Sequence, residues 1–114
     1  MKLSELSGLL GLTTHQSQGR FDVEVSGAYA SDLLSDVMGF AKEKNVWITC
    51  QTHENIVAVA KLRNLAAIIL VNSHKPDEAT LRLAREESVI IFSTSESAFA
   101  ISGKLFNLLA KQNH

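Results

Sequence analysis

The sequence predicts a single α/β domain spanning residues 1–114, built as a three-layer α/β/α sandwich around a mainly parallel sheet. The chain has 114 residues and 46% of them are hydrophobic, which is enough to bury one core without disulfides or metals. Short apolar runs rich in β-branched residues recur along the chain, and such unbroken runs are typical of strands buried on both faces. Each run precedes a helical pattern, and this alternation favours a parallel sheet between two helical layers.

The first part of the chain is predicted to hold a short helix, two β segments and a second helix. Leucines recur at helical spacing within residues 3–10, and the glycine that follows them suits a left-handed helix end. Residues 12–15 and 21–25 are predicted to be strands, the second with alternating apolar and charged side chains and an end at Gly27. Ser31 or Asp32 can cap a helix that continues to about residue 44.

Beyond residue 45 the sequence repeats one unit three times: a buried strand, a polar turn and a helix. The three strand and helix pairs are residues 46–50 with 56–62, 66–71 with 80–87, and 89–92 with 99–109. Pro76, followed by Asp77 and Glu78, marks the start of the middle helix, because proline and acidic residues favour a first helical turn. We therefore expect a Rossmann-like sheet of about four to five strands with right-handed crossovers.

Composition excludes several classes of function. Eleven basic and twelve acidic side chains leave a net charge of −1, so the chain lacks the positive field with which proteins hold nucleic acid. No apolar run approaches the roughly 20 residues of a membrane span, and residues 1–12 lack the apolar stretch of an export signal. Cys50 is the only cysteine, which excludes an internal disulfide and favours a reducing compartment, the cytoplasm. Neither nucleic acid nor a membrane is expected as a partner.

Polar side chains gather in the turns after the three buried strands. In parallel sheets ligands bind at the carboxyl ends of the strands, where backbone N–H groups and helix N-termini are free. His53 and Gln51 would supply directional hydrogen bonds to a small, anionic or nucleotide-like metabolite, and backbone amides of residues 52–55 would receive its negative group. The predicted ligand contacts are Thr49, Gln51, Thr52, His53, Asn55, Asn72, Ser73 and Ser95. The alternative, in which these residues only cap helices and solvate turns, stays open.

A metal site is not expected from the sequence. Cys50 and His53 have a C-x-x-H spacing, and His74 lies after the next strand. A structural zinc site needs four ligands and usually paired cysteines, however, and one cysteine cannot supply them. Cys50 is better explained as a small buried residue.

No catalytic or cofactor motif is present. Residues 102–104, Ser-Gly-Lys, resemble the end of a phosphate-binding loop but lack its upstream glycine, and no G-x-G-x-x-G follows a strand. No G-x-S-x-G or S-x-x-K spacing occurs. Asp32 and Asp36 would share one face of a helix, but a solvated helix face explains such a pair as well. We expect neither an enzyme nor a cofactor.

The last helix carries apolar residues on more than one face. Leu105, Phe106, Leu108 and Leu109 together predict burial on two sides. In so small a domain this favours a homodimer contact. It also supports an alternative function, that of a protein-interaction subunit whose apolar helices dock a partner protein without any small-molecule ligand.

Four segments resemble the DRTGG domain, especially its short stand-alone members: residues 29–38, 46–49, 51–60 and 75–78. The resemblance implies a fold similar to the N-terminal domain of HPr kinase and a regulatory or ligand-sensing role without catalysis. Such domains are also found fused to CBS-domain pairs and to phosphate acetyltransferases. The Asp-Arg-Thr of the family name aligns with residues 52–54, here Thr-His-Glu, and the Gly-Gly aligns with Asn72 and Ser73.

Overall fold

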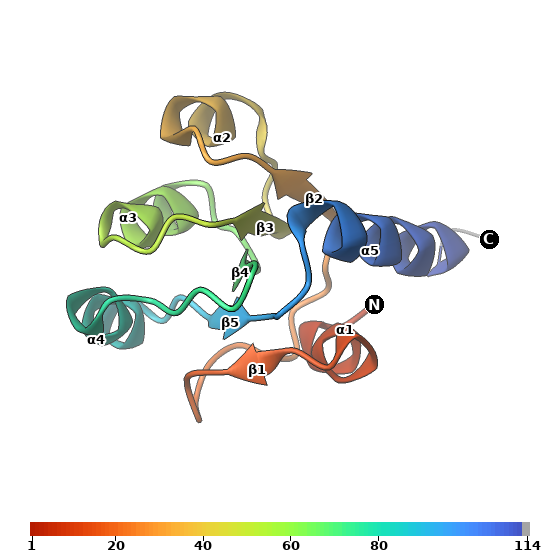
Figure 1. Cartoon of the computed structure of the whole chain (residues 1–114), viewed down its shortest axis with the longest axis horizontal. Coiled ribbons are helices and arrows are strands. Elements are labelled where there is room, and N and C mark those ends of the chain that lie inside the picture. The colour runs from red at the N-terminus through yellow and green to blue at the C-terminus, as the bar shows by residue number, and fades with distance from the viewer. Residues whose placement is uncertain (113–114) are drawn as a thin grey trace.

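The computed structural model describes residues 1–112 as five helices and five strands that alternate over most of the chain (Figure 1). The elements are α1 (Leu3–Leu10), β1 (Thr13–Thr14), β2 (Gly27–Ala30), α2 (Leu34–Phe40), β3 (Asn45–Thr49), α3 (Asn55–Leu62), β4 (Ala67–Leu70), α4 (Glu78–Glu87), β5 (Ile91–Ser93) and α5 (Ala98–Gln112). No helix in this part of the chain is long and apolar enough to cross a membrane.

The strands form one sheet in the order β1-β5-β4-β3-β2. Strands β2 to β5 are parallel to their neighbours, and only β1 runs antiparallel, against β5. Helices α2, α3 and α4 cover one face of the sheet, and α1 and α5 cover the other (Figure 1). The predicted three-layer sandwich with a mainly parallel sheet is therefore confirmed.

Each face of the sheet has its own hydrophobic core, because successive side chains of a strand point to opposite faces. Trp47, Ile68 and Ile91 pack in the cluster under α2, α3 and α4, whereas Ile48 and Phe92 pack in the cluster with α1 and α5. Trp47 has no exposed surface, and its indole N–H donates to the Ser31 carbonyl at 2.8 Å. Burial on both faces explains why these strands lack polar alternation in the sequence.

The strand predicted at residues 21–25 is wrong. This segment pairs with the residues around the start of α1 rather than with the sheet: the amide of Leu3 donates to the Val23 carbonyl at 2.9 Å, and the amide of Val25 donates to the Met1 carbonyl at 2.9 Å. The sheet strand is instead β2, which begins at Gly27, the residue predicted to end a strand. Alternation marks an extended, half-exposed chain but does not specify its pairing partner.

The second helix starts later and ends earlier than predicted. It spans Leu34–Phe40, and neither Ser31 nor Asp32 caps it. The Ser31 hydroxyl accepts from the amide of Leu33 in a turn before the helix, while the Asp32 carboxylate accepts from Thr49 and Cys50 at the end of β3. Because Asp32 lies outside the helix, it does not share a helix face with Asp36.

Helix α5 buries only one side within the chain. Leu105 has no exposed surface, whereas Phe106 is 74% exposed. Leu108 and Leu109 are partly buried. The predicted burial on two sides is thus not achieved by one chain.

Candidate functional site

The predicted contacts lie at one end of the sheet, but they form three separate groups there. The carboxyl ends of β3, β4 and β5 share this end because the strands are parallel. Thr49 is the last residue of β3, and Gln51 follows it. Thr52, His53 and Asn55 lie around the start of α3, and Asn72, Ser73 and Ser95 lie after β4 and β5.

The group at the end of β3 is organised by Asp32, which the sequence analysis did not identify as a contact. One carboxylate oxygen of Asp32 accepts from the Thr49 hydroxyl at 2.7 Å and from the Cys50 amide at 2.9 Å. The side-chain amide of Gln51 donates to the Asp32 carbonyl at 3.1 Å. The Cys50 amide, followed by the Thr49 hydroxyl, holds the pKa of Asp32 below its ordinary value. Thr49 and Gln51 therefore bond within the chain.

Cys50 is a free thiol beside this carboxylate. Partial burial, and next the nearby Asp32, raise the pKa of the Cys50 thiol above its ordinary value. A thiol with a raised pKa stays protonated near neutral pH and is a poor nucleophile. Cys50 is only partly buried, so the expectation of a small buried residue holds in part.

The group at the start of α3 ties this helix to α4. Nδ1 of His53 lies 3.0 Å from the Asp77 carboxylate, and the two side chains are 73% and 50% exposed. The Thr52 carbonyl accepts from the Thr80 hydroxyl at 2.7 Å, and Asn55 is exposed at the first turn of α3. An exposed pair of this kind contributes little to stability. The geometry gives these residues a connecting role between two helices.

The group after β4 and β5 borders a cleft of about 410 Å³. Ser73 and Ser95 line it, as do His15, Lys75 and Ser93, which the sequence analysis missed. Its walls come from the loops after β4 and β5 and from the segment around β1. Lys75 and Ser93 lie within the predicted polar turns but were not predicted to contact the ligand. His15 lies outside those turns, and only the antiparallel pairing of β1 with β5 brings it to the cleft.

Two residues in the loop after β4 have left-handed backbone conformations that favour glycine. Asn72 has φ 55° and Ser73 has φ 61°. This geometry directs the Asn72 amide to the Glu96 carbonyl at 2.9 Å and the Ser73 amide to the Thr94 carbonyl at 2.8 Å. The two loops that wall the cleft are thereby joined. Asn72 and Ser73 therefore adopt, without glycine, a backbone shape that glycine adopts most readily.

His15 and Ser93 form a hydrogen-bonded chain at the cleft. The Ser93 hydroxyl donates to the His74 carbonyl at 2.7 Å, and Nε2 of His15 lies 2.7 Å from the Ser93 oxygen. A hydroxyl has a single proton, so Nε2 of His15 is the donor in the second bond. Burial, and next the charge of Lys75, lower the pKa of His15 below its ordinary value. The neutral ring then leaves Nδ1 as an acceptor.

The charge of the cleft is set by Lys75. The one carboxylate lining it, that of Glu96, accepts from the ammonium group of Lys104. Within residues 1–112, no carboxylate forms a salt bridge with Lys75. The cleft therefore combines an uncompensated cation with several hydroxyl groups.

The cysteine and histidines do not converge on a metal position. Across the described part of the chain, no group of three or more His, Cys, Asp or Glu side chains could hold a metal ion. His74 lies 2.7 Å through Nδ1 from the Val71 carbonyl, and His53 pairs with Asp77. Each candidate ligand thus has a partner within the chain.

The fold and this cleft define a small three-layer α/β domain with a polar pocket at the carboxyl end of a parallel sheet. The DRTGG domain family model matches residues 12–108, so the chain belongs to the DRTGG domain family, and the resemblance seen in the sequence is confirmed. No curated protein matches the chain.

The fold is similar to a crystal structure of the CBS and DRTGG domains of the regulatory region of Clostridium perfringens pyrophosphatase, complexed with its activator, diadenosine tetraphosphate. The TM-score is 0.65 at 14% sequence identity, and the match covers 91% of this chain and 45% of that chain. This chain therefore corresponds to less than half of the regulatory region.

Proposed function

We propose that this domain is a non-catalytic regulatory module that senses a small anionic metabolite at the carboxyl end of the sheet. The metabolite is nucleotide-like because it carries phosphate groups. The observation that carries the proposal is the cleft of about 410 Å³ beside Lys75. Its volume falls within the range of about 300–1,000 Å³ that is usual for small-molecule sites. Membership of the DRTGG family supports a regulatory role, and the single cysteine supports the cytoplasm as its location.

The chemistry of the cleft favours a negative ligand. Lys75 supplies a full positive charge, and Ser95 supplies a hydroxyl donor. The ring of His15 offers Nδ1 as an acceptor for a ligand hydroxyl or amine. Of the contacts predicted from the sequence, Ser73 and Ser95 therefore remain in the proposed site. The other six predicted contacts stay predictions, and hydrogen bonds within the chain already engage five of them through their side chains or backbone: Thr49, Gln51, Thr52, His53 and Asn72.

The same geometry supports a role without catalysis. A serine nucleophile needs a base that accepts its proton, but the Ser93 hydroxyl donates to a carbonyl and accepts a hydrogen bond from the ring N–H of His15. The protonated Cys50 thiol offers no alternative nucleophile. Binding without turnover is the simplest use of these groups.

Ligand binding is tested by calorimetric titration and thermal unfolding with pyrophosphate, AMP, ATP and diadenosine tetraphosphate. The last probe is chosen because the structurally similar regulatory region is complexed with it. A ligand at a hundred times its dissociation constant adds about 2.7 kcal/mol, which raises the midpoint by on the order of 10 °C in a domain of this size. We expect such a shift with at least one phosphate-bearing probe.

Two variants and a control locate the site. Lys75→Ala and Ser95→Ala should weaken binding, the first by about tenfold or more because it removes the charge. Lys42→Ala removes an exposed lysine outside the cleft and should leave the affinity unchanged. If both cleft variants bind as tightly as the wild type, the site is wrong; if no probe binds at millimolar concentration, the sensing function is wrong.

A second candidate function is protein docking through apolar helices. It is favoured by the exposed side of α5, where Phe99 is 91% and Phe106 is 74% exposed. Recovery of a stoichiometric partner protein that is lost in Phe106→Asp, together with a flat ligand panel, would favour this function over sensing.

A further inference from the structure

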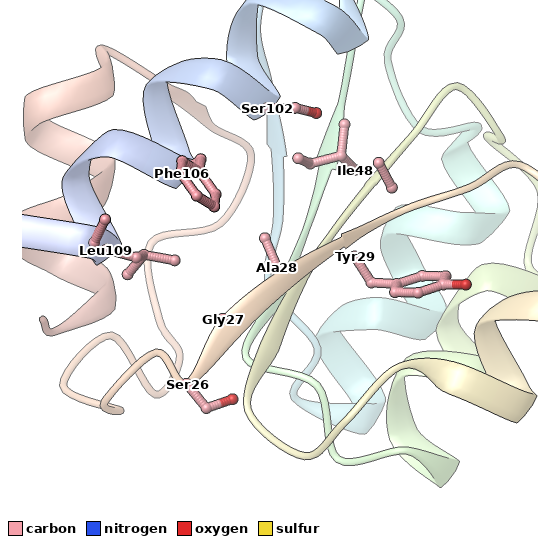
Figure 2. A pocket seen from close by; sticks show the side chains of 10 residues that line it. Ser26, Gly27, Ala28, Tyr29, Ile48, Ser102, Phe106 and Leu109 are labelled. Carbon is pink, nitrogen blue, oxygen red and sulfur yellow. The ribbon is translucent and has the colours of Figure 1, made fainter. Parts of the chain in front are cut away.

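An apolar groove of about 600 Å³ runs between strand β2 and helix α5, away from the polar cleft. Figure 2 shows Ala28 facing Phe106 and Leu109 across the groove, while Tyr29 points to the opposite face of the sheet. The small side chains of Ala28 and Ala30 leave the groove open, and Ile48 of β3 contributes to its floor. No charged side chain lines it.

Strand β2 also forms an open edge of the sheet. Its one strand partner in the described chain is β3, so the outer row of its backbone N–H and C=O groups faces no other strand. Edge strands are normally protected by charged residues or proline, but the sequence Gly-Ala-Tyr-Ala contains neither. The groove and the unprotected edge therefore belong to one continuous surface.

One polar atom at this surface lacks a partner. The Ser102 hydroxyl of α5 is buried without a hydrogen-bond partner among the described residues, and Ser102 lines the groove. Buried polar groups in folded proteins are nearly always paired. Because this oxygen is enclosed within one chain, the groove and the unpaired strand edge, rather than the hydroxyl, are what a second molecule would cover.

We propose that a second copy of this chain occupies the groove, with the two β2 strands paired antiparallel about a two-fold axis. Two identical edge strands pair in this way in an isologous dimer, and the two five-stranded sheets become one continuous sheet. The two α5 helices then lie side by side on the same face, and Phe106 of each copy is covered by the groove of the other. This dimer is independent of the ligand cleft.

Charge and area both fit a second copy. Near a two-fold axis each group meets its own symmetry mate, so charged residues would repel, and this groove has none. A helix of 15 residues is about 22 Å long. The domain is three layers deep, at about 10 Å for each layer. Multiplied by the helix length, this depth gives the β2 side of the domain a flat area of about 660 Å², which protruding side chains increase. A standard interface takes about 800 Å² from each partner, on the order of an eighth of the 6271 Å² that the chain exposes.

The test is the mass of the full chain by sedimentation equilibrium, from low micromolar to near-millimolar concentration. We expect twice the 12.5 kDa of one chain at high concentration. Phe106→Asp and Ala28→Arg should weaken the dimer by about 30-fold or more, because each places a charge at the axis. Leu62→Asp is the matched control: Leu62 of α3 is 72% exposed, close to the 74% of Phe106, and its replacement should leave the dimer intact.

Hydrogen exchange tests the strand pairing itself. Amides of residues 27–30 should exchange more slowly at high than at low protein concentration in the wild type, and this difference should vanish in Ala28→Arg. If Phe106→Asp fails to fold by circular dichroism, Ala28→Arg decides, because the side chain of Ala28 is exposed.

Three results would overturn the proposal. They are a mass of one chain at every concentration, a dimer that persists in both variants, or a monomer whose groove captures a different protein or a small apolar ligand.

Discussion

The chain completes one edge of its sheet and leaves the other open. Along β5, the two residues of β1 pair with Ser93 and Phe92. The Gln16 side chain then takes the place of a longer strand, because its amide donates to the Val89 carbonyl and its oxygen accepts from the Ile91 amide at 2.8 Å. At the opposite edge, no side chain in the described part of the chain bonds to the backbone of β2 in this way. The difference teaches that one side-chain carboxamide can close an edge, and the edge that lacks one, β2, is where we propose that a second copy binds.

The largest expected effect comes from breaking the closed edge with Gln16→Ala. Gln16 is 8% exposed, so its loss leaves a buried carbonyl and a buried amide without partners. We expect the free energy of unfolding, measured by urea denaturation, to fall by about 2–3 kcal/mol. Gln18→Ala, an exposed glutamine in the same loop, should change it by less than about 0.5 kcal/mol.

The open edge supplies the matched comparison. Ala28→Arg should also cost less than about 0.5 kcal/mol at concentrations where the chain is monomeric, because Ala28 is exposed and its side chain faces an open groove. Equal losses in Gln16→Ala and Ala28→Arg would contradict the distinction between a closed and an open edge.

A smaller effect is expected from protonating His15 beside the closed edge. The folded pKa of His15 lies below its ordinary value of 6.5, so the unfolded chain binds more protons between these two values. The stability that neutral His15 contributes is complete above pH 6.5 and is lost as the pH falls through 6.5 toward the folded pKa. We expect the unfolding midpoint of the wild type to fall over this window.

His15→Gln isolates this contribution, because glutamine keeps a donor for Ser93 but does not titrate. The difference between the wild-type and His15→Gln midpoints should shrink or reverse below pH 6.5. A difference that is constant from pH 7 to pH 5 would rule out the proposed protonation effect.

The smallest effect concerns the loop that joins β4 to the closed side of the sheet. Ser73 has φ 61°, and a left-handed conformation costs a residue with a side chain about 1–2 kcal/mol. Ser73→Gly removes this cost. It also gives the unfolded chain more conformational entropy, which lowers the stability of the folded chain by about 0.5–1 kcal/mol. We expect a net gain of about 0.5 kcal/mol by urea denaturation. Ser35→Gly, in the right-handed helix α2, should instead destabilise the chain, and a loss in both variants would contradict the strain at Ser73.

Local sequence was sufficient to predict the buried half of the fold. Strands β3, β4 and β5 and the helices after them were predicted within a few residues, because continuous burial and helical periodicity leave local patterns. Strand β2 was missed because three of its four residues are glycine or alanine and because tertiary contact decides its pairing with Val46 and Trp47. The role of Gln16 depends on residues more than seventy positions away, which no local pattern encodes.

The location of the candidate site was more predictable than its members. Parallel topology alone places the polar turns at one end of the sheet. The sequence does not tell which polar groups already have partners in the chain: Thr49 and Gln51 bond to the segment at Asp32, whereas Ser73 and Ser95 face the cleft. His15 reaches this cleft only through the antiparallel strand β1, and that pairing leaves no periodic signal.

The burial of Trp47 gives the protein its own optical reporter. It is the only tryptophan in the chain, it has no exposed surface, and its strand residue pairs with Tyr29 of the β2 edge. An indole shielded from water emits at shorter wavelength than one in solvent. Fluorescence from this single side chain therefore follows unfolding of the sheet centre without any added label, one strand away from the open edge.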